Sequence, residues 1–448
     1  MRRSAAAIAR SESHPVHLRT LAIESLDSEG RGVARDEGKV VFVEGALPGE
    51  SVEAQTTRRG SSFDQARTVR VLQESAGRRE ARCPHFGLCG GCATQHADPR
   101  VQMAAKQRWL EDCLQRIGKV CTETLLPIVY GEEWGYRHRA RMTVRGMPPP
   151  RGALVGFHER KSSFVADMRQ CENLPPRISR LIPLLRALVS SLEMHERMPQ
   201  IEIAVGEDVD VLVLRNLDPV SDSDADKLRA FADSHRVWLW LQPKGPATAA
   251  PFHPVSMPAL DYTLPEFGIR IAFRPTDFTQ VNHGVNRILV RRAVRMLDPQ
   301  PGERIADLFC GVGNFSLPLA ASGATVLGIE GAADLVERAR QNAESNGLAS
   351  RASFECANLF EVDEQRIAAW GPFEKILIDP PRSGAVELIK ALPDAWPRRI
   401  VYVSCDSATL ARDAGILVNI NGFRLSAAGV VNMFPHTTHV ESIALFER

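Results

Sequence analysis

The sequence predicts an α/β protein in which an N-terminal β-barrel and a mixed α+β region precede a C-terminal open parallel sheet. Short β-branched runs separated by turn residues fill the segment from about His17 to Leu72, as in small barrels. Strand and helix patterns alternate from about Pro275 to the C-terminus, as in a sheet covered on both faces. The 448 residues, 44% of them apolar, suffice for about three domains.

Composition and charge exclude several classes of protein. The net charge of +1 gives no global basic field that would indicate a nucleic-acid partner. No apolar run approaches the roughly 18 residues of a membrane span, and the apolar centre of residues 1–10 is too short for a signal peptide. We therefore expect a cytoplasmic protein without a membrane partner. Nine cysteines, an odd number, favour metal ligands or nucleophiles over a disulfide framework.

The N-terminal segment is expected to form a small β-barrel. Runs such as KVVFVEGAL and TVRVL alternate with the turn signals SEGRG, DEGK, LPGE and RRGSS at near-regular spacing. A barrel of this kind is either a structural appendage or an oligonucleotide-binding module. The pattern of strands alone does not decide between them.

A cysteine-rich loop follows the barrel. RCPHFGLCGGCATQH places Cys83, Cys89 and Cys92 among glycines, and RQCENLPP adds Cys171 much later. Four thiolates that converge from two distant segments predict a metal site that stabilises the fold, and both zinc and an iron–sulfur cluster accept four cysteines. The remaining cysteines outside the C-terminal motif are expected to be small apolar fillers: Cys113, Cys121, Cys310 and Cys356.

The region after the cysteine loop begins with a predicted helix and continues as mixed α and β structure. Asp98 is expected to cap this helix, which Gly118 ends. The stretch YRHRARMTVRG then predicts a strand with arginines on one face. That face is either a solvated strand face or a ridge that contacts phosphates. The lack of acidic residues between the arginines favours the ridge. Its members are Arg137, Arg139, Arg141 and, after a one-residue shift, Arg145.

The first strand of the C-terminal region leads into a glycine loop that indicates a nucleotide-like cofactor. In ERIADLFCGVGNFSLPLA the strand ends at Asp307, Gly311 and Gly313 form the loop, and a helix starts near Phe315. Such a loop serves nicotinamide cofactors as well as S-adenosylmethionine, but Ser316 replaces the third glycine of the dinucleotide fingerprint. Glu330, at the end of the next strand, is placed to accept hydrogen bonds from two ribose hydroxyls in either case.

The next two strands bring reactive groups to the same edge of the sheet. EKILIDPPRSG ends in Asp379, Pro380 and Pro381, a rigid turn beside the cofactor crevice. Enzymes that methylate exocyclic amines commonly follow such a turn with an aromatic residue, whereas Arg382 follows here. VYVSCDSATLARD places Cys405 at the end of the following strand, so its thiol should face the same crevice.

A thiol at this position suits methylation of C5 of uracil. That carbon is too weak a nucleophile to take a methyl group from a sulfonium, but addition of a thiolate at C6 turns it into an enolate that can. A base must then remove the C5 proton before the thiol departs. The segment VVNMFPHTTHVESIALFER offers Glu441, whose pKa burial could raise, with His436 and His439 upstream.

Six motifs carry a resemblance to a known family. CPHFGLCGGC, FTQVN, DLFCGVGNFSLPLA, IDPPRSG, VSCDSATLARD and FPHTTHVE occur in the order found in bacterial RNA uracil-C5 methyltransferases, over nearly the whole chain. The barrel resembles the RNA-binding TRAM domain. Barrel plus cysteine cluster is most similar to the members that make 5-methyluridine in 23S ribosomal RNA.

The resemblance implies roles for individual residues and a Rossmann-like S-adenosylmethionine-dependent catalytic domain. Cys405 is the implied nucleophile and Glu441 the implied general base. A [4Fe-4S] cluster is implied on Cys83, Cys89, Cys92 and Cys171. The implied contacts to S-adenosylmethionine are Gln280, Phe309, Asn314, Glu330, Asn358 and Asp379, of which Asn358 could equally be a turn asparagine.

The same resemblance sets the expected domains and partners. A TRAM-like barrel spans residues 1–75, an iron–sulfur and RNA-binding domain spans 76–97 and 120–270, and the catalytic domain spans 98–119 and 271–448. The expected partner is 23S ribosomal RNA, bound by a monomer without an obligate protein partner. Two alternatives remain: an RNA cytosine-C5 methyltransferase, which would carry a second cysteine in the acid-Pro turn, and a non-catalytic iron–sulfur RNA-binding protein, which would not bind S-adenosylmethionine.

Overall fold

The structure, a computed structural model, describes residues 18–147, 152–256 and 258–448. Residues 1–10, on which the signal-peptide argument rests, and the start of the predicted 1–75 domain lie outside the described residues. The chain divides into two compact units. The first extends to Glu80 and includes His96–Val101, and the second comprises Ala81–Gln95 and Gln102–Arg448.

The first unit is the predicted β structure. Its strands form one sheet in the order β1-β5-β6-β4-β3-β2, with β4 and β6 parallel and the other pairs antiparallel. Alternate residues such as Val41 and Val43 are buried in a core of the sheet's own, which period-2 patterning predicts. The strands are β1 Leu18–Ala22, β2 Ser25–Leu26, β3 Gly32–Asp36, β4 Lys39–Glu44, β5 Ser51–Arg59 and β6 Phe63–Gln73.

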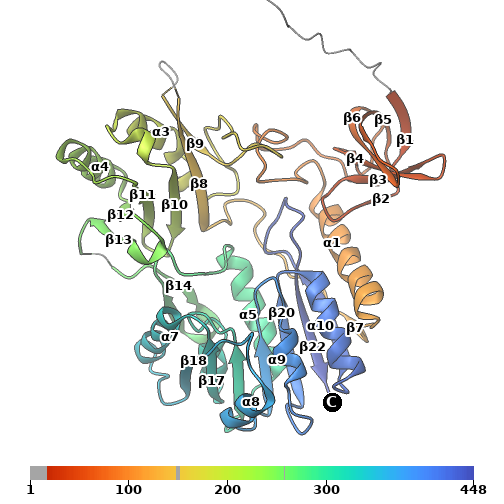
Figure 1. The fold of residues 1–448 in the computed structure, drawn as a ribbon, viewed down its shortest axis with the longest axis vertical. Helices are drawn as coiled ribbons and strands as arrows, with labels where there is room; N and C mark the ends of the chain where they lie inside the picture. Colours follow the sequence, from red (N-terminus) through yellow and green to blue (C-terminus); the bar gives the residue numbers. More distant parts are fainter. Residues whose placement is uncertain (1–17, 148–151, 257) are drawn as a thin grey trace, which may run out of the picture. The chain divides into compact units, whose positions relative to one another are not determined.

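The second unit begins with a mixed sheet of order β13-β12-β11-β10-β8-β9 (Figure 1). Its apolar core lies between the sheet and the helices α2, α3 and α4. The strands are β8 Arg139–Gly146, β9 Ala153–Gly156, β10 Gln200–Val205, β11 Asp210–Arg215, β12 Trp238–Gln242 and β13 Ala250–His253. The helices are α2 Pro176–Ser179, α3 Leu181–Ser191 and α4 Asp222–His235, and the hairpin β14 Asp261–Leu264 and β15 Ile269–Ala272 follows.

The C-terminal sheet has the order β18-β17-β16-β19-β20-β22-β21-β7 (Figure 1). The first five strands are parallel, and the last strand enters antiparallel between β20 and β21, so the sheet is mixed rather than wholly parallel. The strands are β7 Thr124–Leu125, β16 Arg304–Leu308, β17 Thr325–Glu330, β18 Ala352–Cys356, β19 Lys375–Ile378, β20 Arg399–Ser404, β21 Arg424–Val431 and β22 Glu441–Glu447.

Helices cover both faces of this sheet, as the nearly continuous apolar strands predict. Val401 and Val403 of β20 pack in the core that contains α5, α6 and α7, whereas Ile400 and Tyr402 pack in the core that contains α1, α8, α9 and α10. The helices are α5 His283–Leu297, α6 Ser316–Ala321, α7 Ala333–Ser345, α8 Glu364–Trp370, α9 Val386–Lys390 and α10 Ser407–Asn419. The predicted α/β class with an N-terminal barrel is confirmed.

The helix predicted after Asp98 is α1, Pro99–Cys113, which continues as a π-helical turn over Leu114–Gly118. The Asp98 side chain accepts a hydrogen bond from Arg100 N at 2.9 Å, as a cap does. Lys119, with φ of 55°, adopts the left-handed conformation that ends the turn. Gly118 lets the turn approach α10, because a Cβ added at Gly118 would lie 2.3 Å from Ala411 O.

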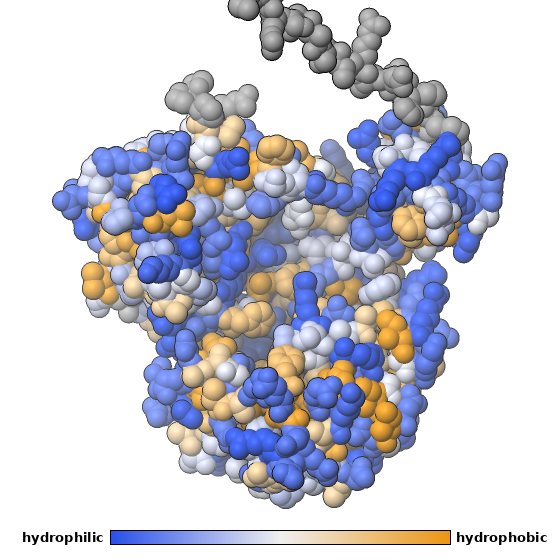
Figure 2. All heavy atoms as spheres, viewed as in Figure 1, coloured by the Kyte–Doolittle hydropathy of each residue, from blue (hydrophilic) through white to orange (hydrophobic). Residues whose placement is uncertain are grey.

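The face of the molecule seen in Figure 2 is covered mostly by hydrophilic side chains, with apolar patches between them. No helix in the described part of the chain has the length and apolarity that crossing a membrane requires. The division of the second unit into a central and a catalytic domain stays a prediction, because these regions cluster together.

Candidate active site

A cavity of ≈ 470 Å³ opens at the carboxyl edge of the C-terminal sheet. It lies where the strand order changes direction, since β16 is followed in the chain by β17 on one side and later by β19 on the other. Open α/β sheets bind their ligands at this point. The cavity is lined by all eight residues predicted for the cofactor and for catalysis: Gln280, Phe309, Asn314, Glu330, Asn358, Asp379, Cys405 and Glu441.

The glycine loop is anchored to Glu330. Gly311 N donates to one carboxylate oxygen at 3.1 Å, and Ala332 N donates to the other at 3.0 Å. Gly311 has φ of 54°, and nothing lies within 4 Å of a Cβ built there, so conformation rather than crowding favours glycine. The carboxylate keeps lone pairs that can accept ribose hydroxyls.

Two asparagines in the cavity are held by different contacts. Asn314 accepts from Tyr262 Oη at 2.9 Å and exchanges two hydrogen bonds with Asn286, at 2.9 and 3.0 Å. Asn358 Oδ1 accepts from Phe360 N at 3.1 Å, so Asn358 is a turn asparagine that also lines the cavity. The rings of Phe309 and Phe360 lie 5.5 Å apart. Sequence reasoning missed Phe360, and an aromatic residue in the turn after a predicted strand is the signal that could have identified it.

Two carboxyl groups at the strand ends are shifted toward the neutral form. Burial raises the pKa of Asp307 to about 7 although Ser316 Oγ donates to its Oδ2. Burial, followed by the charge of Asp307, raises the pKa of Asp379 to about 8. Asp307 Oδ1 has no hydrogen-bond partner among the described residues. Asp379, the member of the pair that lines the cavity, would be stabilised as a carboxylate by a positive charge there.

Cys405 lies in the turn between β20 and α10, where its neighbours are fixed. Asp406 caps α10 by accepting from Ala408 N at 2.9 Å and Thr409 N at 3.1 Å. Burial, followed by the charges of Glu441 and Asp379, raises the pKa of the Cys405 thiol to about 11. Arg382 acts in the opposite direction. In the free protein the thiol is thus neutral at pH 7, and a positive charge is needed to favour the thiolate.

Glu441 is brought beside Cys405 by the register of the sheet. Ser404, the last residue of β20, pairs with Ser442 of β22, so Cys405, which follows β20, and Glu441, the first residue of β22, are neighbours. Glu441 is 5% exposed, and its Oε2 has no hydrogen-bond partner among the described residues. Burial, followed by the charge of Asp379, raises its pKa to about 8. A buried carboxyl group with a free oxygen next to a thiol can act as a general base.

The two histidines of the same segment differ. His436 is buried, stacks on Trp134 with ring centroids 3.9 Å apart, and contacts Gln102 through Nδ1 at 3.3 Å. Its backbone oxygen accepts from Ala93 N at 2.9 Å and Thr94 N at 3.1 Å, which connects the cysteine loop to the segment before Glu441. Burial lowers the pKa of His439 to about 4.

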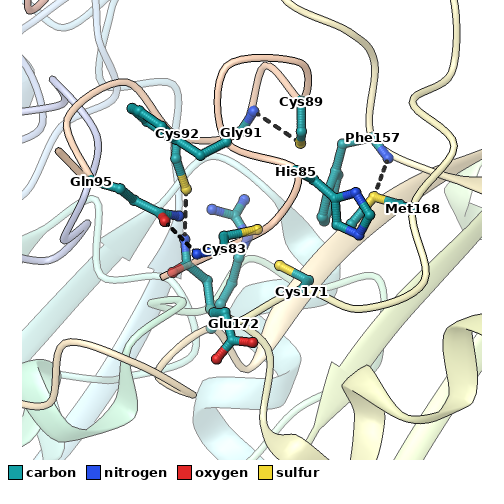
Figure 3. A pocket seen from close by; sticks show the side chains of 13 residues that line it. Cys83, His85, Cys89, Gly91, Cys92, Gln95, Phe157, Met168, Cys171 and Glu172 are labelled. Atoms are coloured by element: carbon teal, nitrogen blue, oxygen red, sulfur yellow. Dashed lines mark hydrogen bonds between the residues drawn. The ribbon is translucent and has the colours of Figure 1, made fainter. Parts of the chain in front are cut away.

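The four predicted metal ligands line one separate cavity of ≈ 200 Å³. Figure 3 shows their side chains around a common space, three from the cysteine loop and Cys171 from another segment. Asn173 Nδ2 donates to Cys92 Sγ at 3.2 Å, and Gly91 N donates to Cys89 Sγ at 3.4 Å. In the described ranges no three His, Cys, Asp or Glu side chains are arranged as ligands of a single metal ion.

Two predictions about individual residues are wrong in part. Cys113 and Cys310 are buried, but Cys121, which lies outside any helix or strand, and Cys356, the last residue of β18, are exposed. Among the arginines, β8 places residues 139, 141 and 145 on one side without a one-residue shift.

The arginine face of β8 is not free of acids. Glu202 of the neighbouring strand β10 pairs opposite Arg141, with Nη2 and Oε1 2.9 Å apart. Arg139 is half-buried, and burial lowers its pKa. Only Arg145 of the three β8 arginines is both exposed and outside this ion pair. Arg141 of the predicted ridge is therefore paired with an acid, and contact of the ridge with phosphates stays a prediction.

Known proteins resemble the chain over nearly its whole length. The tRNA (Uracil-5-)-methyltransferase family matches residues 260–448, and the TRAM domain matches residues 18–59. A 23S rRNA (uracil(1939)-C(5))-methyltransferase RlmD of Nitrosospira multiformis is 60% identical over 95% of this chain and 98% of its own. The RlmD of Cupriavidus metallidurans is 57% identical over 99% and 97%.

A solved structure shares the fold. The tRNA (uracil-54, C5)-methyltransferase of Pyrococcus abyssi, in complex with S-adenosyl-L-homocysteine, superposes with a TM-score of 0.74 at 22% identity, over 96% of this chain and 100% of its own. The superposition therefore includes residues of both compact units. With the RlmD relatives at 57–60% identity, the chain belongs to the RlmD family of 23S rRNA (uracil(1939)-C(5))-methyltransferases.

Proposed function

We propose that the chain transfers a methyl group from S-adenosylmethionine to C5 of a uridine in 23S ribosomal RNA, at the position that corresponds to 1939 in the names of its relatives. The observation that carries this proposal is the single cavity lined by a thiol, a buried carboxyl group and the glycine loop. Family membership points to the same reaction. We place the reaction in the cytoplasm, where bacterial ribosomal RNA is made.

The chemistry begins with Cys405. The thiol loses its proton to solvent, the thiolate sulfur forms a bond to C6 of uracil, and the electrons of the C5–C6 double bond move into an enolate. C5 then takes the methyl group as the sulfonium S–CH₃ bond breaks, which leaves S-adenosylhomocysteine. Glu441 takes the proton from C5, the C5–C6 double bond reforms, and the C6–S bond breaks to release the thiolate.

Six residues are proposed to hold S-adenosylmethionine in this cavity. Glu330 would accept the ribose hydroxyls, and the rings of Phe309 and Phe360 are suited to contact the adenine. Asp379 would face the positive charge of the ligand. The full set is Gln280, Phe309, Asn314, Glu330, Asn358 and Asp379.

We also propose that Cys83, Cys89, Cys92 and Cys171 hold a [4Fe-4S] cluster. The four thiols line one cavity, and backbone and amide N–H groups donate to two of the sulfurs, as suits thiolates. The four cysteines would each supply one thiolate to the cluster. When bound, the cluster would connect the cysteine loop to the segment around residue 171 and add folding energy.

Methylation of C5 of cytosine is the second candidate reaction, because an enzyme of that class would also use a thiol. The acid-Pro turn at Asp379 continues with Pro381 and Arg382, where that class carries a second cysteine. The test is a map of 5-methyluridine in 23S ribosomal RNA from a strain that lacks this chain. Loss of one 5-methyluridine, restored by the wild-type chain and not by Cys405→Ala, is expected. An unchanged map, or loss of 5-methylcytidine, contradicts the proposal.

A further inference from the structure

Lys106 is a buried cation beside the proposed base. The buried face of α1 carries Gln102 and Lys106 in its first half and Leu110 and Cys113 in its second half. Lys106 is 4% exposed, and lysine is almost never buried to this degree without a partner. The reaction described above does not use it. Its burial therefore calls for a specific function.

The ammonium group is held by two uncharged acceptors. Nζ donates to Asn432 Oδ1 at 2.8 Å and to Phe434 O at 2.9 Å. Both acceptors follow β21, whose last residue Val431 pairs with Glu441 in the neighbouring strand. The hydrogen bonds thus direct the ammonium toward the end of the strand pair that carries the proposed base, and they leave its positive charge uncompensated.

The charge of Lys106 acts on Glu441. It lowers the pKa of Glu441, while burial and the charge of Asp379 raise it. Burial lowers the pKa of Lys106 to about 7, and the charge of Glu441 raises it. Cys405 and His439 also face this site, and burial keeps both of them neutral at pH 7. Lys106 is thus the cation that favours the carboxylate form of Glu441.

We propose that Lys106 is a positioning residue for the methyltransfer, which favours the ionised form of Glu441 when the C5 proton leaves and holds the turn before it. The inference rests on the proposed function, because the base is needed only if a proton leaves C5. A protonated Glu441 could not accept that proton, and the methylated Cys405 adduct would persist.

The test separates the charge of Lys106 from its hydrogen bonds. Lys106→Gln keeps N–H donors for Asn432 and Phe434 without the charge, and Lys106→Arg keeps the charge. Gln102→Met, one turn earlier on the same buried face, is the matched control for loss of a polar side chain. Adduct formation and release are measured in single turnovers on a uridine-containing 23S ribosomal RNA fragment between pH 6 and 9.5, on denaturing gels.

Release should increase with pH and level off once Glu441 is ionised. Loss of a nearby opposite charge raises a carboxyl pKa by about 1–3 units. Lys106→Gln should therefore release the adduct about tenfold to a thousandfold more slowly at pH 7, and the midpoint of its pH profile should lie above that of the wild type. Lys106→Arg should show the wild-type dependence of the release rate on pH. Gln102→Met should show the wild-type midpoint pH, whatever its maximal rate.

Three results would overturn the inference. The first is a Lys106→Gln enzyme with the wild-type pH profile. The second is an equal slowing by Lys106→Gln and Gln102→Met at every pH, which indicates a structural role only. If Lys106→Gln does not fold, Lys106→Met, which also removes the charge, takes its place, and a wild-type pH profile in that variant is the third. A wild-type enzyme that forms neither adduct nor 5-methyluridine instead refutes the proposed function.

Discussion

The ionisation of Cys405 should depend on the charge of the molecule in the cavity. Its thiol pKa is about 11 because of burial and the charges of Glu441 and Asp379. S-adenosylmethionine carries a positive sulfonium, whereas S-adenosylhomocysteine has the same shape without that charge and without one methyl group. A positive charge within a few ångströms lowers a thiol pKa by about 1–3 units, so the thiolate fraction at pH 7.5 should increase about tenfold to a thousandfold.

The assay is the rate at which iodoacetamide alkylates Cys405 in the absence of RNA, followed by mass spectrometry of the Cys405 peptide. Exposed Cys121, which does not line the cofactor cavity, is the internal control in the same protein, since its rate should not depend on the ligand. We expect faster alkylation of Cys405 with S-adenosylmethionine than with S-adenosylhomocysteine at pH 7.5. Equal rates with the two saturating ligands would refute the electrostatic reasoning.

Three further predictions concern RNA binding and the cluster. Deletion of residues 1–75 should weaken binding to a 23S ribosomal RNA fragment and leave the dissociation constant of S-adenosylmethionine unchanged, because the cofactor residues belong to the other unit; a large loss of cofactor binding would contradict this. Anaerobically purified protein should contain iron and sulfide in near-equal amounts, and Cys89→Ser should lower both and the melting temperature; stoichiometric zinc in colourless protein would contradict the cluster. Arg145→Ala should lower the number of ions released on RNA binding, read from the slope of log K against log salt, by about one. Arg141→Ala, which only frees Glu202, should change that slope less, and equal effects would contradict the pairing seen in the sheet.

The C-terminal fold and the place of the site could be predicted because local patterns determine them. Strand and helix periods alternate, and the carboxyl ends of parallel strands must meet at one edge of the sheet. Glu330, Asp379 and Cys405 each end a recognisable strand or follow it directly, so their common cavity follows from the pattern. Gln280 lies outside any such pattern, and only the family resemblance indicated it.

Features that depend on long-range pairing could not be predicted. Glu202 neutralises Arg141 because β10 lies beside β8, and no local pattern gives that register. Lys106 looks like a solvated helix residue in the sequence, whereas its acceptors come from residues more than 300 positions later. Cys356 reads as a filler in its strand, but it is the last residue of an edge strand and is exposed. The burial of these side chains is set by the assembled sheets.

The covalent adduct tests the central claim most directly. RNA that carries 5-fluorouridine at the target should accept the methyl group and stall, because fluorine cannot leave as a proton. On a denaturing gel with labelled RNA, the wild-type protein should form the adduct and Cys405→Ala should not. Glu441→Gln should form a methylated adduct with natural uridine and release it slowly. An adduct formed by Cys405→Ala would remove this thiol from the mechanism, and normal turnover by Glu441→Gln would remove the carboxylate.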